Sequence, residues 1–246
     1  MHMRVLAKNL HAQLHPVLFD LPNHGSSPWV SPGDFIGTQS IVEASIDAEC
    51  SAMGLARDSK IHLVGHSLGG KYAMIYALQN PQRVATLVVL DIAPMTYPAI
   101  NTRYFDAYRN AFAQHPHNRK EYVEHLHQNV QQKEIAFTLS KNVYQDEKGD
   151  IRLYCNLDEI EKQHDALRSF PSAYDVKRYD GPTLFVRAEH TEYFPDNAEQ
   201  YIQRYFTQYS IAQIEGSTHF LHIDSVQLVS QQLNALYTQY IARKEE

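Results

Sequence analysis

One serine stands in a pattern that enzymes use to expose a reactive hydroxyl. Residues 65–69 read Gly-His-Ser-Leu-Gly, the Gly-x-Ser-x-Gly pattern of a nucleophile elbow. In such a turn the serine sits on a sharp strand-to-helix reversal, and Gly65 and Gly69 are expected there because a Cβ would clash. The pattern predicts Ser67 as a nucleophile for acyl chemistry. The backbone N–H of Leu68, at the start of a helix, is the predicted oxyanion donor.

A serine hydroxyl becomes a good nucleophile only when a base removes its proton, and the chain offers fourteen histidines. His219 is the predicted base because it follows the last expected strand in a turn that reads Gly-Ser-Thr-His. It also comes last in the chain order Ser, acid, His. His222 is the alternative base.

The carboxylate that would orient this histidine has several candidates. The usual place, after the last strand but one, carries Thr191, which cannot orient an imidazolium by charge. Asp91 follows the preceding strand at the same edge of the sheet and is the predicted acid, although an Asp there could equally cap a loop or helix. Glu189, Glu192 and Asp158 are the alternatives.

Metal, cofactor and nucleic-acid chemistry find no support in the sequence. Cys50 and Cys155 lie far apart, outside any disulfide or ligand spacing, and are interpreted as packing residues. The His-x-His pairs at 115–117 and 125–127 are interpreted as solvated surface, because Pro116 breaks one pair and no carboxylate ligand pattern accompanies them. The net charge of −6 and the absence of a Lys/Arg run give no footprint for nucleic acid. We predict a small-molecule substrate and no metal or cofactor.

The chain carries no pattern typical of a membrane protein. No stretch approaches the ~18 apolar residues that a membrane span requires. Residues 1–14 lack the apolar centre of a signal peptide, and the two isolated cysteines fit a reducing compartment. A cytoplasmic location is predicted, whereas the oligomeric state cannot be predicted from these features.

The elements that must position these side chains alternate between apolar runs and amphipathic segments. This alternation predicts an α/β fold with a mostly parallel central sheet flanked by helices. Strands are expected at 16–20, 60–64, 84–90, 182–186 and 209–214, and helices at 4–13, 40–54, 71–78, 196–206 and 226–240.

The pattern changes in the middle of the chain. Residues 95–179 are polar, rich in Tyr and His, and contain an expected hairpin at 143–154. We interpret this stretch as a cap insertion, with 1–94 and 180–246 forming the core. A chain of 246 residues is long enough for one such domain with an insertion.

Three motifs together resemble the α/β-hydrolase superfamily, and more narrowly YbfF-type carboxylesterases and related abhydrolase-domain proteins. They are Phe-Asp-Leu-Pro-Asn-His-Gly-Ser-Ser-Pro at 19–28, the elbow followed by lysine at 65–71, and Leu-Asp-Ile-Ala-Pro at 90–94. The resemblance implies an α/β-hydrolase fold with a helical cap. It also implies cleavage of small to medium carboxylic esters or thioesters through an acyl-serine intermediate, and it favours Asp91 as the acid.

The beginning of the chain departs from this superfamily. Its members normally start with about three strands and a His-Gly loop that completes the oxyanion hole, whereas the printed chain starts at what resembles the first helix. We therefore expect an upstream segment with a strand between 17–20 and 60–64. Two other functions stay open: a catalytically weak or silent binding protein on a hydrolase fold, and a carbon–carbon hydrolase or lyase.

Overall fold

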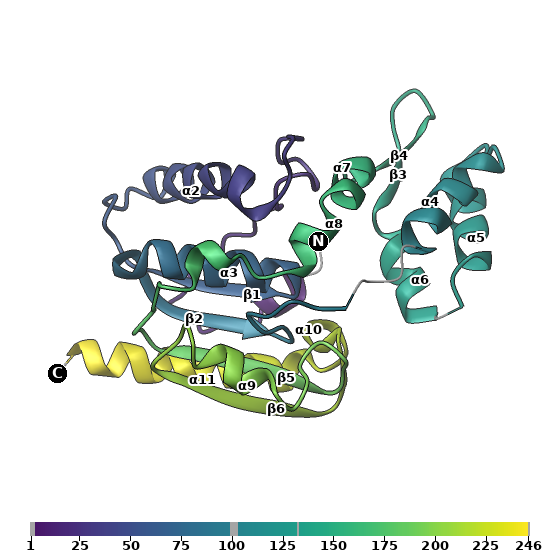
Figure 1. Cartoon of the computed structure of the whole chain (residues 1–246). Helices are drawn as coiled ribbons and strands as arrows, with labels where there is room; N and C mark the ends of the chain where they lie inside the picture. Colours follow the sequence, from purple (N-terminus) through teal and green to yellow (C-terminus); the bar gives the residue numbers. More distant parts are fainter. Residues whose placement is uncertain (1–2, 99–102, 132, 246) are drawn as a thin grey trace. The chain divides into compact units, whose positions relative to one another are not determined.

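Four of the five expected strands form one sheet in the computed structural model, which describes residues 3–98, 103–131 and 133–245 (Figure 1). Every pair of neighbouring strands in this sheet is parallel. The order across the sheet is β1-β2-β5-β6, so the α/β class with a parallel central sheet is confirmed. The strands are β1 (Ile61–His66), β2 (Val84–Leu90), β5 (Thr183–His190) and β6 (Tyr209–Thr218).

The prediction of a strand at 16–20 is wrong. These residues form no strand, and the side chains of Val17, Leu18 and Phe19 are 39–48% exposed. A short apolar run becomes a strand only when a neighbouring edge accepts its backbone hydrogen bonds, and no described strand lies beside this run. Within the described residues β1 is thus an outer strand of the sheet.

Helices cover both faces of the sheet. Successive side chains of a strand point to opposite faces, so Val88 and Val89 of β2 mark the two sides. Val88 packs with Val229 and Leu233 of the last helix in one buried cluster. Gly70 of the elbow helix lies on the other side, close to the Val89 side chain. β2 is buried along its whole length, as an inner strand between two helical layers should be.

The chain divides into two compact units, which we call the core unit and the second unit. The core unit comprises Met1–Phe19, Gln39–Thr96 and Ser169–Glu246, and the second unit comprises Asp20–Thr38 and Tyr97–Arg168. The division into a core of 1–94 and 180–246 and a cap of 95–179 stays a prediction. The helices that contribute to the core unit are α1 (Arg4–Ala7), α2 (Phe35–Ala52), α3 (Leu68–Gln79), α9 (Ala198–Ile202), α10 (Leu221–Asp224) and α11 (Val226–Glu245), with 3-10 turns η1 (Pro81–Arg83) and η2 (Ser172–Tyr174).

Several helix ends differ from expectation. The helix expected at 4–13 ends at Ala7, and α9 covers only part of the expected 196–206. The helix expected from Ser40 begins at Phe35, so the residues that resemble a capping box lie inside α2. Its buried side includes Ile46, whereas Met53 is 45% exposed near the helix end. Gly54 follows with a φ of +70° and ends the helix as predicted.

The second unit has a small core of its own. The expected hairpin at 143–154 is confirmed: β3 and β4 pair antiparallel, and Gly149 in the turn has a φ of +87°. Tyr122 and Leu126 are buried in its apolar cluster. Its elements are α4 (Arg103–Ala113), α5 (Arg119–Gln128), α6 (Lys133–Ser140), β3 (Val143–Gln145), β4 (Ile151–Leu153), α7 (Leu157–Lys162) and α8 (His164–Arg168).

Both cysteines, Cys50 and Cys155, are buried and unbridged, which agrees with their interpretation as packing residues. None of the helices in the described ranges is both long and apolar enough to span a membrane.

Candidate active site

The predicted site residues follow the ends of the parallel strands. Ser67, Asp91 and His219 each come one residue after a strand, namely β1, β2 and β6. Thr191 occupies the same position after β5. Because the carboxyl ends of parallel strands meet at one edge of a sheet, four side chains with hydrogen-bonding atoms lie along this edge. The backbone is held there too, since the Ser67 N–H donates to Leu90 O at 3.0 Å.

The elbow at Ser67 is a strained turn. Ser67 has a φ of 52° and a ψ of −121°, a conformation that residues with a Cβ rarely adopt. A Cβ on Gly65 would lie 2.2 Å from Gly69 O, so this glycine is required by the close approach of α3. The expectation for Gly69 is wrong, because a Cβ there would meet no atom within 4 Å. The second required glycine is Gly70, where a Cβ would lie 2.6 Å from Ile92 Cγ2.

A pair of alanine substitutions tests this view of the elbow. Gly65→Ala is expected to destabilise the fold by about 3 kcal/mol or more, since it places a methyl group against rigid backbone. Gly69→Ala, the matched control in the same motif, is expected to be neutral or to stabilise by up to about 1 kcal/mol, because alanine is the better helix former. The free energy of unfolding in urea measures both. Equal stabilities of the two variants would contradict the close packing of β1 on α3.

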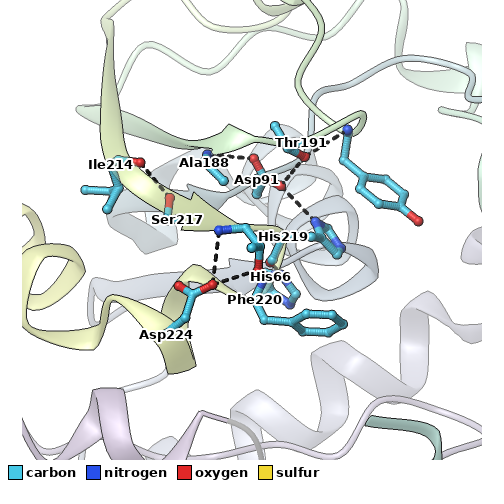
Figure 2. A network of polar contacts seen from close by, with 11 residues as sticks. His66, Asp91, Ala188, Thr191, Ile214, Ser217, His219, Phe220 and Asp224 are labelled. Atoms are coloured by element: carbon cyan, nitrogen blue, oxygen red, sulfur yellow. Dashed lines mark hydrogen bonds and ion pairs between the residues drawn. The ribbon is translucent and has the colours of Figure 1, made fainter. Parts of the chain in front are cut away.

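Asp91 and His219 form a hydrogen-bonded pair. His219 Nδ1 lies 2.8 Å from Asp91 Oδ2, and Asp91 is fully buried (Figure 2). The other carboxylate oxygen, Oδ1, accepts the backbone N–H of Ala188 at 2.8 Å. Since an ionised carboxylate can only accept, Nδ1 of His219 carries the hydrogen. In the neutral imidazole Nε2 then has the lone pair, which is what a general base requires.

The loop that carries His219 is fixed from two sides (Figure 2). Asp224 accepts both the backbone N–H of Thr218 at 3.0 Å and its hydroxyl at 2.7 Å. His66 Nε2 lies 2.7 Å from the carbonyl oxygen of His219, which can only accept, so His66 donates. The rings of His66 and His222 lie 4.2 Å apart. The alternative base, His222, is therefore buried against His66, while the contact with Asp91 is made by His219.

The alternative acids have other partners or positions. Glu189 Oε2 accepts the backbone N–H of Gly216 at 2.6 Å, and Glu192 is exposed. Asp158 belongs to the second unit and pairs with Arg109 at 2.8 Å. Of the candidate carboxylates, Asp91 is the one that the structure brings to His219.

The sequence interpretation missed Thr191. Its hydroxyl donates to Asp91 Oδ2 at 2.6 Å, the oxygen that also faces His219. From the sequence alone, Thr191 is interpreted only as a position that lacks an acid. Its place directly after a strand, like that of Ser67 and Asp91, was the signal that could have identified it.

Ser67 and Leu68 stand at the N-terminus of α3. Leu68 is the first residue of the helix, and first-turn N–H groups have no acceptor within a helix. Among the described residues no hydrogen bond joins Ser67 Oγ to His219, so Ser67 is related to the pair by their common strand edge. In the same residues, no group of three or more His, Cys, Asp or Glu side chains is arranged to hold a metal ion. This includes the described histidines of the two His-x-His pairs.

Comparison with known proteins gives a consistent picture. The family model of the alpha/beta hydrolase fold matches residues 3–226. The chain is 30% identical over 214 residues to the sn-1-specific diacylglycerol lipase ABHD11 of Mus musculus. The aligned region covers 85% of this chain and 66% of that protein. The chain is 24% identical over 230 residues to ethanol acetyltransferase 1 of Kluyveromyces marxianus, covering 82% of this chain and 60% of that protein. The chain thus spans 60–66% of the length of these two relatives.

A solved structure is similar over most of the chain. A marine microorganism esterase superimposes with a TM-score of 0.76 and 25% sequence identity, covering 88% of this chain and 82% of the esterase. An enol-lactonase from Burkholderia xenovorans, with a TM-score of 0.59 and 13% identity, shares the fold.

Proposed function

We propose that this chain, which belongs to the α/β-hydrolase fold family, is a serine hydrolase that cleaves carboxylic esters or thioesters of small to medium acyl groups. The observation that carries the proposal is the 2.8 Å contact between His219 Nδ1 and the buried Asp91, at the strand edge that also bears Ser67. Similarity to a protein described as a diacylglycerol lipase and to another described as an esterase supports an ester substrate.

In the proposed reaction, His219 Nε2 takes the hydroxyl proton of Ser67 while Ser67 Oγ attacks the acyl carbon. The backbone N–H of Leu68 donates to the oxyanion that forms. Collapse of this intermediate breaks the bond to the alcohol or thiol, and His219 returns the proton to that leaving group. A water molecule, deprotonated by His219, then attacks the acyl-serine. The bond between the acyl carbon and Ser67 Oγ breaks, His219 returns the proton to Oγ, and the carboxylic acid is released.

Turnover of simple esters tests the proposal. The protein is expected to release nitrophenolate from p-nitrophenyl acetate and butyrate and to react covalently with a fluorophosphonate probe, as an activated serine does. A matched panel of oxygen esters and thioesters of equal acyl length would show the preferred leaving group. If the protein showed no turnover and no labelling, the proposal would be contradicted, and the alternative of a silent binding protein would be favoured.

A second candidate is transfer of the acyl group to an alcohol. Its support is the similarity to a protein described as an ethanol acetyltransferase. In that reaction an alcohol replaces water in the attack on the acyl-serine, so the ester product is formed in place of the acid. Adding ethanol to the p-nitrophenyl acetate assay distinguishes the two, because a transferase produces ethyl acetate at the expense of acetate. The carbon–carbon hydrolase or lyase alternative and the cytoplasmic location stay predictions.

A further inference from the structure

The side chain of Thr191 connects the end of β5 to the acid of the proposed site. Its Oγ1 lies 2.6 Å from Asp91 Oδ2, and the same Oγ1 accepts the backbone N–H of Tyr193 at 3.0 Å. A hydroxyl has one hydrogen to donate and two lone pairs that accept. Because an ionised carboxylate cannot donate, the Thr191 hydrogen must point to Asp91. The Tyr193 N–H occupies a lone pair of Thr191 and keeps the hydroxyl turned this way.

This arrangement distributes three donors over one carboxylate. The Ala188 N–H is bound to Oδ1, while Thr191 and His219 share Oδ2. The carboxylate of Asp91 therefore cannot turn without breaking at least one of these bonds. Its buried position gives it no water to replace a lost donor.

Tyr193, two residues after Thr191, packs against the ring of the proposed base, His219. The rings of Tyr193 and His219 are stacked, with centroids 3.9 Å apart and planes at 28°. The ring of His66, from the end of β1, lies 4.6 Å from that of His219. A tyrosine face also attracts positive charge, and His219 becomes positive when it accepts the serine proton.

We infer that Thr191 and Tyr193 form a clamp that positions the Asp91–His219 pair: Thr191 fixes the carboxylate, and Tyr193 fixes the plane of the imidazole. We call these two residues the clamp. This inference rests on the proposed function for its effect on rate, although the contacts themselves do not depend on it. Both residues act through Asp91 and His219, so both are positioning residues.

The clamp also affects how readily His219 takes a proton. The hydrogen bond from Thr191 offsets part of the negative charge of Asp91. Without this bond, Asp91 attracts the imidazolium of His219 more strongly. The other titratable rings near His219 are Tyr193, His66 and, behind His66, His222. His66 and His222 are unchanged in every variant below, so their electrostatic effect on His219 is the same in all of them.

Thr191→Val is the decisive variant, because it keeps the shape of the side chain and removes the hydroxyl. It is expected to lower kcat for p-nitrophenyl butyrate by about tenfold with little change in KM, as for loss of one hydrogen bond to a charged group. The acidic limb of the kcat/KM profile is expected to move to higher pH by a few tenths of a unit. Thr191→Ser should restore both. Tyr193→Leu, which keeps the backbone N–H, should lower kcat but leave the Thr191 bond intact.

Thr207→Val is the matched control. It removes a hydroxyl that donates to a carboxylate, Asp180 Oδ1, at the same 2.6 Å in the same unit, but at the opposite ends of the strands. Its kcat and pH profile are expected to equal those of the unchanged protein.

A readout independent of turnover separates the two proposals. The Nδ1–H proton of His219 should give a downfield nuclear magnetic resonance signal that Thr191→Val broadens or shifts and Thr207→Val does not. If the unchanged protein cleaves no ester, the proposed function fails while this signal still tests the clamp. If Thr191→Val matches Thr207→Val in signal and pH profile, the clamp is overturned. If Thr191→Val lowered activity but left both the Nδ1–H signal and the acidic limb of the kcat/KM profile unchanged, the clamp would be overturned as well, since this result would indicate a general packing effect.

Discussion

Ser67→Ala is expected to lower kcat for p-nitrophenyl butyrate by about 10⁴- to 10⁶-fold and to abolish labelling by a fluorophosphonate. Without Oγ no acyl-serine can form, and only the remaining groups at the strand edge can assist a direct attack by water. The fold should be retained, because alanine keeps the Cβ that Ser67 already carries at its φ of 52°. The free energy of unfolding should change by less than about 0.5 kcal/mol.

Ser51→Ala is a suitable control for this substitution. Ser51 is exposed near the end of α2, and its replacement should leave turnover and labelling unchanged. If Ser67→Ala were labelled as strongly as the unchanged protein, the nucleophile would be a different residue.

Asp91→Asn is expected to lower kcat by up to ~10⁴-fold. The amide nitrogen would face His219 Nδ1 as a donor, so the imidazole would adopt the tautomer with its hydrogen on Nε2. That tautomer cannot accept the serine proton. Folding should survive, because asparagine tolerates the φ of 51° found at this position and its amide oxygen can still accept the Ala188 N–H.

Glu189→Gln serves as the comparison for the acid. Its oxygen accepts a backbone N–H, which an amide oxygen can also do, so activity should fall less than about tenfold. A small effect of Asp91→Asn together with a severe effect of Glu189→Gln or Glu192→Gln would assign the role of the acid to that glutamate.

The parts of the fold that could be predicted from sequence are those that local pattern determines. The run 84–90 is apolar except for Thr86 and becomes a strand buried on both faces. The hairpin turn has a glycine, Gly149, at its positive φ, and the elbow at Ser67 has Gly65 where a Cβ would clash with the following helix.

The wrong predictions fall where residues distant in sequence determine the local structure. Residues 16–20 have the composition of a strand, but no described strand edge receives them. Gly69 belongs to the motif, yet the close approach falls on Gly65 and Gly70, which depends on how α3 lies on β1 and β2. Thr191 carries no charge, and its contact with Asp91 becomes visible only when β2 and β5 lie side by side.

The separation of Asp91 and His219 along the chain has a consequence for folding. They lie 128 residues apart, and the second unit's stretch Tyr97–Arg168 is synthesised between them. β1 and β2 are joined through α3 and η1 alone, so their pairing closes a short loop, whereas the pairing of β2 with β5 must close a much longer one. Loop closure costs more conformational entropy as the loop lengthens, and non-local strand pairing is slow. A refolding chain can therefore complete the elbow early, while the contact that orients His219 is among the last to form.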